Sequence, residues 1–394
     1  MSETKETVYL DNSATTKICD AALTRYIEVS REHYGNPSSL HGIGYDAEKV
    51  LTGARETIKK TLSGEGGEII FTSSGSEANN LALLGRMRAK ERFRRGGKVI
   101  ISDGEHASVD NTADELSREG FTVIRVPTVG GFIDAERLAE LLDDRVYLVS
   151  IMHVNNLTGA VYDIPRLAEL IRRLAPECAI HTDATQSYMK LPVSARALGV
   201  DMITVSSHKI EGPKGVGALW VSDKLIRSGG LSPVIFGGGQ ERGLRSGTEN
   251  VPAVAAFAAA AEVGAAKLKE NAERLAALRG YIVKRIESEP GLSGYRVTVP
   301  QEYAPHILNI ISPGIRSETL LHYLSSLGIY VSSGSACSSN SKVRHRSALD
   351  AFGLSPDEVD CSVRVSLSHE NTESDLDALA EGLITAVARL AKKR

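Results

Sequence analysis

The sequence predicts an α/β protein in which a large domain is built on a mostly parallel sheet and a smaller α+β domain completes the chain. Two features of the pattern lead to this fold class. Short apolar runs alternate with longer segments of helical periodicity from residue 68 to residue 221, as they do where helices connect parallel strands. A long Ala/Leu/Lys/Glu-rich segment at 251–288 then leads into a mixture of short strands and helices. With 394 residues, the chain is long enough for two domains.

The large domain is expected to begin with two helices. A loop at Gly35, Asn36 and Pro37 separates them, because glycine, asparagine and proline favour turns. Its strands are short and mostly apolar, whereas its helices carry apolar residues at helical spacing. We expect strands at 68–72, 99–102, 122–126, 146–152, 179–182, 202–205 and 218–221, and helices at 21–32, 46–62, 77–94, 108–118, 134–142 and 164–174.

One continuous helix at 251–288, with Pro252 near its start, is expected to leave the large domain. The smaller domain follows, and the amino-terminal segment is expected to join it. The resulting division is a large domain at 15–260 and a small domain made of 1–14 and 261–394. In the small domain we expect strands at 296–299, 307–311, 328–331 and 363–367, and helices at 318–327 and 372–391.

Composition and charge exclude several classes of function. The chain is 42% hydrophobic and 24% charged, and its formal net charge is -3, so neither nucleic acid nor an anionic membrane is an expected partner. The polar amino terminus lacks the apolar core of a signal peptide, and the apolar run at 253–266 is too short to span a bilayer. We therefore expect a cytoplasmic protein.

The cysteines and histidines do not suggest a structural framework or a metal centre. The four cysteines are scattered without paired spacing, so no disulfide framework or zinc knuckle is predicted. The histidines do not form pairs with helix-face spacing beside a carboxylate, so no metal ligands are predicted. We expect Cys19, Cys178 and Cys361 to have structural roles.

Polar or ionisable residues follow five of the predicted strands. In parallel sheets, ligands bind at the carboxyl ends of the strands. The five strand ends should therefore meet at one edge and form a site. The groups are Ser74–Ser76, Glu105–His106, Asn155–Asn156, Asp183 to Gln186, and Ser206 to Lys209.

Lys209 lies in a glycine-rich turn directly after the predicted strand at 202–205. A lysine in this position is well placed to form a Schiff base with a carbonyl cofactor, although an ordinary surface lysine would fit the stretch alone. Gly75 and Ser76 precede a predicted helix, where backbone N–H groups and the helix dipole favour an anion. Simple N-capping of that helix by Ser76 is the alternative.

Together these residues meet the needs of a phosphorylated pyridine cofactor. Gly75–Ser76 offer N–H donors for its phosphate, and Asp183 offers a carboxylate that keeps the ring nitrogen protonated. His106 can stack on the ring, Gln186 can donate to its phenolic oxygen, and Lys209 can bind its aldehyde.

The motifs H-V-N-N, H-T-D-A-T-Q, S-S-H-K-I-E-G-P-K-G, R-S-G-T and S-S-G-S-A-C occur in this order along nearly the whole chain. In them the chain resembles the pyridoxal-phosphate-dependent cysteine desulfurases of the NifS/IscS type, within the class V aminotransferase family of fold type I. The resemblance implies that family's seven-stranded sheet, the cofactor pyridoxal 5'-phosphate and the substrate L-cysteine.

The resemblance also implies a role for each matching residue. Lys209 is similar to the Schiff-base lysine, Asp183 to the partner of the ring nitrogen, and His106 to the stacking histidine that also moves protons. Gln186 matches the donor to the phenolic oxygen. The remaining matches are Gly75, Ser76, Ser206 and His208 around the phosphate, Thr248 contributed across a homodimer interface, Asn156 and Arg364 at the substrate carboxylate, and Cys337 as the sulfur-accepting cysteine.

Five positions depart from the pattern of the family. Ser74 and Ser76 replace a glycine and a threonine, which keeps a hydroxyl group near the phosphate. Lys17 replaces a proline and Ser368 replaces a glycine. Glu211 places a carboxylate close to Lys209, where an uncharged or aromatic residue is expected. None of these changes removes a group that the chemistry needs.

Cys337 lies in a stretch of small polar residues, followed by Lys342, Arg344, His345 and Arg346, which would favour the thiolate. The implied function is conversion of L-cysteine to L-alanine, with the sulfur passed to Cys337 as a persulfide for iron–sulfur cluster assembly or tRNA thiolation. The expected acceptor is a scaffold protein or a tRNA-thiolation protein. A selenocysteine lyase, another class V enzyme and a non-catalytic assembly platform remain alternatives.

Overall fold

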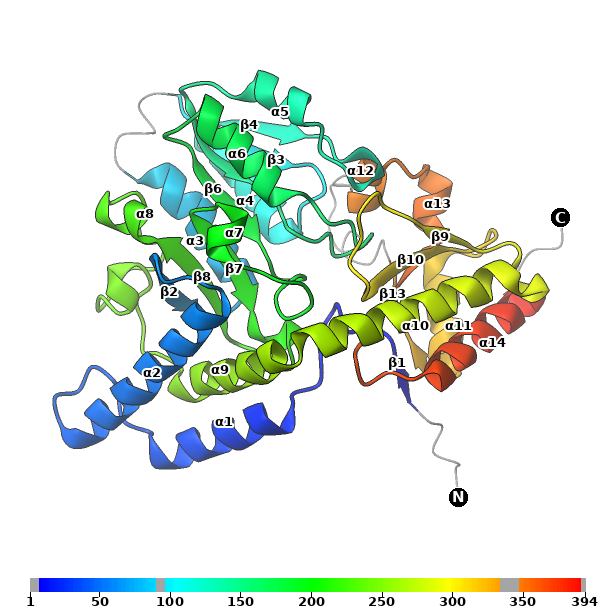
Figure 1. The fold of residues 1–394 in the computed structure, drawn as a ribbon, viewed down its shortest axis with the longest axis horizontal. Helices are drawn as coiled ribbons and strands as arrows, with labels where there is room; N and C mark the ends of the chain where they lie inside the picture. The colour runs from blue at the N-terminus through cyan, green and yellow to red at the C-terminus, as the bar shows by residue number, and fades with distance from the viewer. Residues whose placement is uncertain (1–6, 90–95, 334–346, 391–394) are drawn as a thin grey trace.

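The computed structural model describes residues 7–89, 96–333 and 347–390. The predicted sulfur-accepting residue, Cys337, lies outside the described residues. The described residues form a seven-stranded sheet, a four-stranded sheet and a two-stranded pair, and a bent pair of helices joins the two larger of these (Figure 1). We call the residues packed around the larger sheet the large-sheet region, and those packed around the smaller sheet the small-sheet region.

The larger sheet has seven strands in the order β2-β8-β7-β6-β5-β3-β4. Its neighbours pair in parallel except at β8, which runs antiparallel to both β2 and β7. The predicted α/β class, with a mostly parallel sheet, is therefore confirmed. The strands are β2 (Gly67–Thr72), β3 (Lys98–Ser102), β4 (Thr122–Val126), β5 (Val146–Ser150), β6 (Ala179–Asp183), β7 (Met202–Ser206) and β8 (Gly217–Ser222).

Helices cover both faces of this sheet, so its central strands are buried along their whole length. Every residue of β6 and β7 is buried, as is typical of parallel strands between two helical layers. Alternate residues of a strand enter different cores: Ile203 packs in one core and Met202 in the other. The covering helices are α1 (Asp20–Glu32), α2 (Gly42–Thr61), α3 (Gly75–Arg88), α4 (Ala107–Arg118), α5 (Ala135–Leu141), α6 (Ile164–Leu174), α7 (Ala195–Leu198), α8 (Asp223–Arg227) and α9 (Val251–Ala266).

The smaller sheet is antiparallel, with the order β12-β13-β10-β9, and it has its own hydrophobic core. A parallel pair, β1 with β11, lies beside it and brings the amino-terminal segment to this core. The elements are β1 (Val8–Tyr9), β9 (Arg296–Thr298), β10 (Ile307–Ile311), β11 (Ile329–Tyr330), β12 (Ser332–Ser333), β13 (Ser362–Ser366), α10 (Leu268–Ser288), α11 (Ser317–Ser326), α12 (Ala348–Phe352), α13 (Pro356–Asp360) and α14 (Glu373–Leu390). The division of the chain at residues 15 and 260 stays a prediction.

The prediction of a single helix at 251–288 is wrong. Lys267 leaves the helical conformation, with φ -108° and ψ 8°, and separates α9 from α10. The two helices meet at 71° because they serve different cores: α9 packs on the larger sheet's core, whereas α10 packs on the smaller one's. In the described part of the chain, no single helix is long and apolar enough to cross a membrane, and only this bent pair passes such a test when its two members are combined.

The helix expected at 77–94 also differs from the structure. It begins earlier, at Gly75, because the side chain of Ser74 caps it by accepting a hydrogen bond from the N–H of Glu77. It ends at Arg88, since Ala89 has an extended backbone. The expectation that Ser76 caps this helix is therefore wrong, and Ser76 lies in its first turn.

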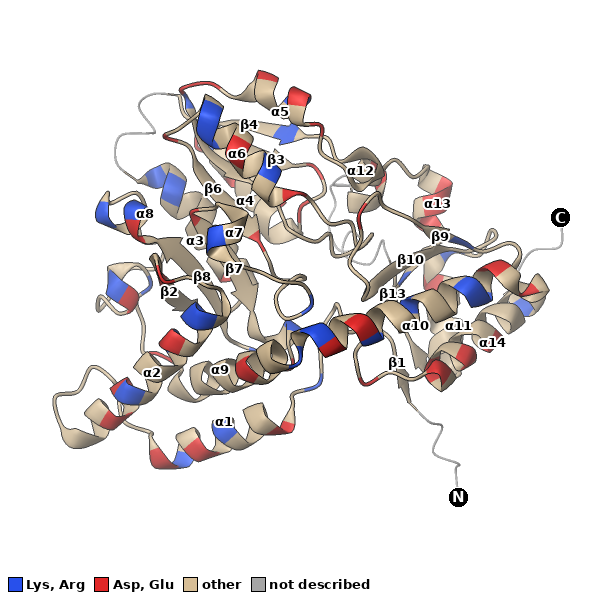
Figure 2. Ribbon diagram, viewed as in Figure 1, with Lys and Arg blue, Asp and Glu red and all other residues tan. Residues whose placement is uncertain are grey.

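Charged residues are dispersed along the exposed helices of both regions, with acidic and basic side chains interspersed (Figure 2). This distribution agrees with the small formal net charge of -3.

Candidate active site

A cavity of about 350 Å³ lies at the carboxyl ends of the strands of the larger sheet. All five predicted strand-end groups contribute to it, and the small-sheet region closes one side with residues of β12 and β13. The lining residues are Ser13, Ala14, Ser74, Gly75, Ser76, Asn79, His106, Ser108, Met152, Val154, Asn156, Leu157, Asp183, Thr185, Gln186, Ser206, His208, Lys209, Ser332, Ser333 and Arg364. Of the predicted site residues that the structure describes, all except Thr248 line this cavity.

Lys209 reaches the cavity from a short 3₁₀ turn, Ser207–Lys209, that directly follows β7. Its Nζ donates hydrogen bonds to the carbonyl oxygens of Ser13 and Ala14, at 2.5 and 2.7 Å. The amino-terminal segment is itself held in place by the residue before Lys209, because Thr16 donates through both its N–H and its hydroxyl group to the carbonyl of His208. The position of the amine is thus defined by a segment that also contacts the smaller sheet.

Asp183 ends β6 and is only 5% exposed. Its Oδ2 accepts a hydrogen bond from Nδ2 of Asn79 at 2.8 Å, and its Oδ1 accepts one from the N–H of Thr185 at 2.9 Å. A buried carboxylate that is oriented by two donors and aimed into a cavity is suited to hold a protonated ring nitrogen.

His106 caps the amino terminus of α4 and opens onto the cavity. Its Nδ1 is 2.8 Å from Oγ of Ser108 and 3.1 Å from the N–H of the same residue. The protein atoms around the ring disfavour its charged form and lower the pKa of His106; Asp183 opposes this shift and Lys209 adds to it. A neutral imidazole is the form that stacks on an aromatic ring and can take up a proton.

The expected phosphate end lies at the start of α3. There the backbone N–H groups of Gly75 and Ser76 face the cavity at a helix amino terminus. The hydroxyl oxygen of Ser206 is buried and has no hydrogen-bond partner among the described residues. A Cβ atom on Gly75 would lie 3.3 Å from Cβ of Ser206, and one on Gly217 would lie 2.6 Å from the backbone of Ser74. These glycines keep the pocket open and allow β8 to pass close to it.

His208 lines the same end of the cavity, and its Nδ1 is 3.1 Å from Oγ1 of Thr15. Burial lowers the pKa of His208 to about 4, and the nearby cations Lys209 and Lys214 contribute to the shift. His208 is therefore neutral at physiological pH and can act there as a hydrogen-bonding group, not as a cation.

The opposite end of the cavity holds Arg364, on β13 of the small-sheet region. Arg364 donates to Oδ1 of Asp11 at 2.6 Å and to the backbone carbonyl of Asn156 at 3.0 Å. Its Nε is buried and unpartnered among the residues that the structure describes. A fixed guanidinium group with a remaining donor suits a carboxylate ligand. Gln186 also lines the cavity, and it donates to the carbonyl of Ser13 at 3.1 Å.

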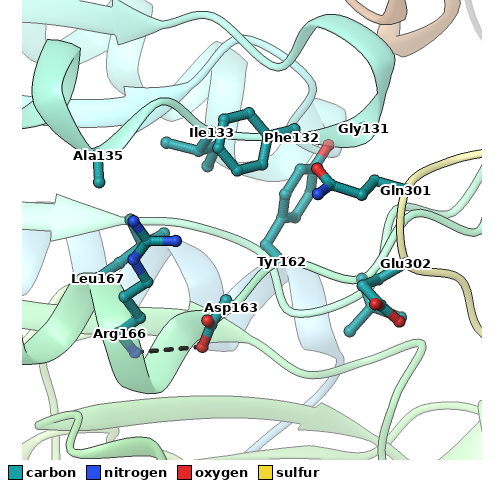
Figure 3. Close-up of a pocket in the computed structure, with 11 residues that line it drawn as sticks. Gly131, Phe132, Ile133, Ala135, Tyr162, Asp163, Arg166, Leu167, Gln301 and Glu302 are labelled. Atoms are coloured by element: carbon teal, nitrogen blue, oxygen red, sulfur yellow. Dashed lines mark hydrogen bonds between the residues drawn. The ribbon is translucent and has the colours of Figure 1, made fainter.

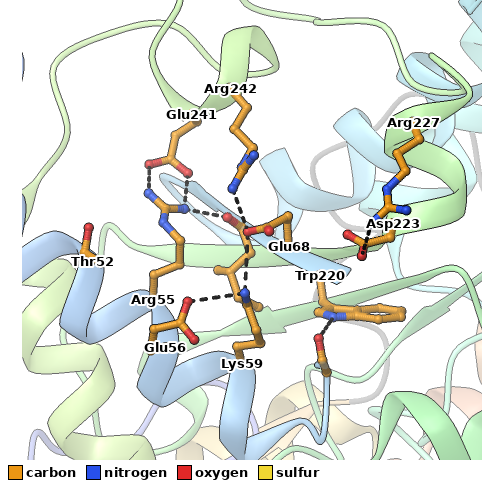
Figure 4. Close-up of polar contacts among 12 residues, drawn as sticks. Thr52, Arg55, Glu56, Lys59, Glu68, Trp220, Asp223, Arg227, Glu241 and Arg242 are labelled. Carbon is orange, nitrogen blue, oxygen red and sulfur yellow. Dashed lines mark hydrogen bonds and ion pairs between the residues drawn. The ribbon is translucent and has the colours of Figure 1, made fainter. Parts of the chain in front are cut away.

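Thr248 does not line the cavity of its own chain and lies exposed on the loop that precedes α9. This loop is anchored firmly (Figure 4). The carboxylate of Glu241 is buried and pairs with Arg55 of α2 at 2.7 and 2.8 Å. Further along the loop, Arg245 pairs with Glu77 in the first turn of α3, at 2.8 Å. The loop is thus tied to the helix that forms the expected phosphate site.

Sequence reasoning missed several residues of the site. Asn79 belongs to the interior of α3, and its contact with Asp183 gives no signal in the local pattern. Ser13 and Ala14 fall in a short polar stretch, D-N-S-A-T-T, that follows none of the five predicted strand ends. The other polar residues missed are Ser108, Ser332 and Ser333. Polar residues at helical spacing from Gly75 were the one signal that could have identified Asn79.

A second cavity, of about 210 Å³, contains none of the predicted site residues (Figure 3). It lies between α5, α6 and the loop that follows β9, with Tyr162 and Phe132 in its wall. Arg166 and Asp163 meet there through a hydrogen bond from the backbone N–H of Arg166, at 3.2 Å. Outside both cavities, Glu28, Glu32 and His33 could bring ligand atoms within 4.8 Å of one another.

Comparison with known proteins gives consistent results. Residues 8–379 match the family described as Aminotransferase class-V. The chain is 39% identical over 385 residues to cysteine desulfurase IscS 1 of Archaeoglobus fulgidus, covering 97% of both chains. It is 41% identical over 373 residues to a NifS/IcsS protein homolog of Lactobacillus delbrueckii subsp. bulgaricus, covering 94% of both. Among solved structures, a NifS-like protein matches with a TM-score of 0.88 at 35% identity, covering 98% of this chain and 100% of that one.

Proposed function

Because the chain belongs to the class-V aminotransferase family, whose enzymes use pyridoxal 5'-phosphate, we propose that it is a cysteine desulfurase. In this proposal it converts L-cysteine to L-alanine and collects the sulfur as a persulfide on Cys337. One observation carries the proposal: a single cavity unites Lys209, Asp183, His106 and the start of α3 with Arg364, which reaches in from the small-sheet region.

The donor set of the cavity fits the cofactor at each of its ends. Gly75 and Ser76 would bind the phosphate, Asp183 the ring nitrogen, His106 the ring face, and Lys209 the aldehyde. When bound, the cofactor withdraws electrons from the substrate carbon. Ser206 would supply its unpartnered hydroxyl group to the phosphate, where the Thr248 of a second subunit is also expected.

The protein's own groups would orient L-cysteine and move its protons. Arg364 binds the substrate carboxylate, with Asn156 beside it, and Lys209 removes and returns the proton at Cα. The thiolate of Cys337 attacks the substrate sulfur. The carbon–sulfur bond then breaks, its electron pair stays on carbon, and a proton on that carbon completes L-alanine. The sulfur remains on Cys337 in a new sulfur–sulfur bond.

The chain geometry supports this role for Cys337. Ser333 lines the cavity and is the last described residue before the segment that contains Cys337. Cys337 follows Ser333 by four positions in the sequence, and four residues of chain span at most about 14 Å. Of the other cysteines, Cys178 is buried, and burial raises the pKa of its thiol to about 12, which disfavours a nucleophilic role.

The activity is tested by incubating the purified holoenzyme with L-cysteine and measuring alanine and sulfide. The wild type should release equal amounts of both in the presence of a reducing thiol. Cys337→Ala should keep its cofactor yet lose sulfide release. Undiminished sulfide release by Cys337→Ala would reject the role of Cys337. Parallel assays with L-selenocysteine separate a desulfurase from a selenocysteine lyase, which would release alanine only from the selenium substrate.

We also propose a homodimer in which Thr248 of each subunit completes the phosphate site of the other. Two segments expose apolar side chains that a partner subunit would cover: residues 34–45, which comprise the loop before α2 and its first turn, and residues 235–248. Their exposed fractions range from 40% at Ile235 to 106% at Leu40. The set comprises Tyr34, Leu40, Ile43, Tyr45, Ile235 and Phe236.

The sulfur bound to Cys337 must pass to an acceptor. We propose that this acceptor is a protein, either an iron–sulfur scaffold or a tRNA-thiolation protein. A reducing compartment such as the cytoplasm suits this chemistry, because the three described cysteines are free and the nucleophile is a thiolate. We also propose that residues 15–260 form one domain and that residues 1–14 and 261–394 form the other. The substrate would then bind between the two domains.

A further inference from the structure

Glu211, the departure from the family pattern that lies closest to Lys209, faces the small-sheet region. Its Oε1 lies 3.2 Å from Nδ1 of His369. Glu211 belongs to the turn after β7, whereas His369 follows β13. The ion pair therefore joins the segment that carries Lys209 to the segment that carries Arg364.

The backbone of Glu211 is held in an uncommon conformation. Its φ of 66° is in the left-handed region, which residues other than glycine adopt at a cost. Two hydrogen bonds hold it there: its N–H donates to Oγ1 of Thr16 at 2.8 Å, and its carbonyl accepts from the N–H of Cys19 at 2.9 Å. Such strain persists only where the surroundings enforce it, and it marks a position with a specific task.

The partner, His369, is fixed as firmly on its own side. Arg274 of α10 donates through Nε to the carbonyl of His369 at 2.5 Å and through a terminal nitrogen to the carbonyl of Asn371 at 2.8 Å. Neither end of the ion pair is therefore on a loose segment, and a change in the pair is transmitted to the elements behind it.

The electrostatic surroundings keep Glu211 ionised. Its side chain is 18% exposed and that of His369 is 25% exposed, so salt screens the pair less than it screens surface charges. Burial alone would raise the pKa of Glu211, but the hydrogen bond with His369 and the nearby cations Lys190 and Lys267 outweigh burial and lower this pKa.

We infer that the Glu211–His369 ion pair is a positioning contact that sets the separation between Lys209 at the cofactor end and Arg364 at the carboxylate end of the cavity. The inference rests on the proposed function, because only a substrate that spans both residues is sensitive to their separation. L-cysteine must present its carboxylate to Arg364 and its Cα to Lys209 at the same time. A looser contact between the two regions would therefore weaken productive binding of the substrate more than it would weaken binding of the cofactor.

Three substitutions test the pair without disturbing the left-handed backbone. Glu211→Gln and His369→Gln each remove one member of the charged pair. His369→Lys instead replaces the histidine by another cation. Each Gln variant should raise KM for L-cysteine about five-fold, with kcat and the cofactor absorption spectrum unchanged. The double variant, Glu211→Gln with His369→Gln, should raise KM no further than either single variant, because the same interaction is lost in all three proteins. His369→Lys should return KM towards the wild-type value.

Arg296→Gln serves as a matched control: it breaks an ion pair with Glu358 that lies within the small-sheet region, and its KM should remain that of the wild type.

Hydrogen exchange provides a measurement that does not depend on activity. In holoenzyme without substrate, amides at 207–212 and 366–371 should exchange faster in Glu211→Gln than in the wild type. Wild-type KM and wild-type exchange in both Gln variants of an enzyme that produces alanine would overturn the inference. Failure of the wild type itself to produce alanine would instead reject the proposed function, and the exchange rates would still test whether the pair holds the two segments together.

Discussion

Nδ2 of Asn79 lies 2.8 Å from Oδ2 of Asp183 and 2.8 Å from Oγ of Ser108. Ser108 in turn contacts Nδ1 of His106 at 2.8 Å. One amide in α3 thus connects the residue expected beneath the ring nitrogen with the residue expected to stack on the ring. The orientations of Asp183 and His106 would therefore depend on Asn79, although Asn79 itself takes no part in the chemistry.

Replacing Asn79 by Ala should therefore weaken cofactor binding. A hydrogen bond to a charged group contributes about 1.5–3 kcal/mol, so the affinity for pyridoxal 5'-phosphate should fall at least about ten-fold. Titration of the apoprotein with the cofactor, followed by absorbance, measures the change. Asn111→Ala, on the exposed face of α4, is the control and should bind normally. Equal affinities of the two variants would show that Asn79 does not orient Asp183.

The buried carboxyl group of Glu105 should make stability depend on pH. Burial raises the pKa of Glu105 to about 8, although Ser102 and the N–H of Met152 both donate to its Oε1. Between an unfolded pKa of about 4.3 and this raised value, the folded state keeps a proton that the unfolded state releases. The free energy of unfolding should therefore fall as the pH rises, by at most about 1.4 kcal/mol per pH unit from this group.

Urea unfolding of wild type and Glu105→Gln at pH values from 5 to about 8 tests this prediction. The variant cannot release the proton, so the difference between the two proteins should grow in its favour as the pH rises. A difference that stays constant over this range would mean that Glu105 is ionised in the folded protein.

Arg364→Lys should separate substrate binding from cofactor binding. Lysine keeps the positive charge but cannot hold a carboxylate through two parallel hydrogen bonds, so KM for L-cysteine should rise between about ten-fold and 100-fold. The cofactor spectrum should not change, because Arg364 lies at the other end of the cavity. Steady-state kinetics with L-cysteine measure the effect. An unchanged KM would place the substrate carboxylate elsewhere.

Phe236→Asp should break the proposed dimer. Phe236 is 80% exposed, and a carboxylate in its place would be buried without a partner in the interface. Sedimentation should show a shift to monomer, and cofactor affinity should fall because Thr248 of the partner is lost. Val299→Asp, at a site 63% exposed in the small-sheet region, should remain dimeric. A dimeric Phe236→Asp variant with normal affinity would place the interface on another face.

Much of the fold and the site could be predicted because their signals are local. Apolar runs followed by small polar residues identified all five strand ends, and parallel pairing then brought them to one edge. The contact between Asn79 and Asp183 joins residues 104 positions apart, and the pairing of Glu211 with His369 depends on how two sheets are placed. The break at Lys267 was missed for a related reason: helix propensity is high on both sides of it, and only the two separate cores require a bend.

The central claim is that the cavity holds pyridoxal 5'-phosphate on Lys209. Treating the holoenzyme with borohydride, which traps the cofactor on the amine that binds it, and mapping the peptides by mass spectrometry tests this claim directly. The cofactor should be found on the peptide that contains Lys209, and Lys209→Ala should yield no labelled peptide. A cofactor trapped instead on Lys190 or Lys214, or label that persists in Lys209→Ala, would contradict it.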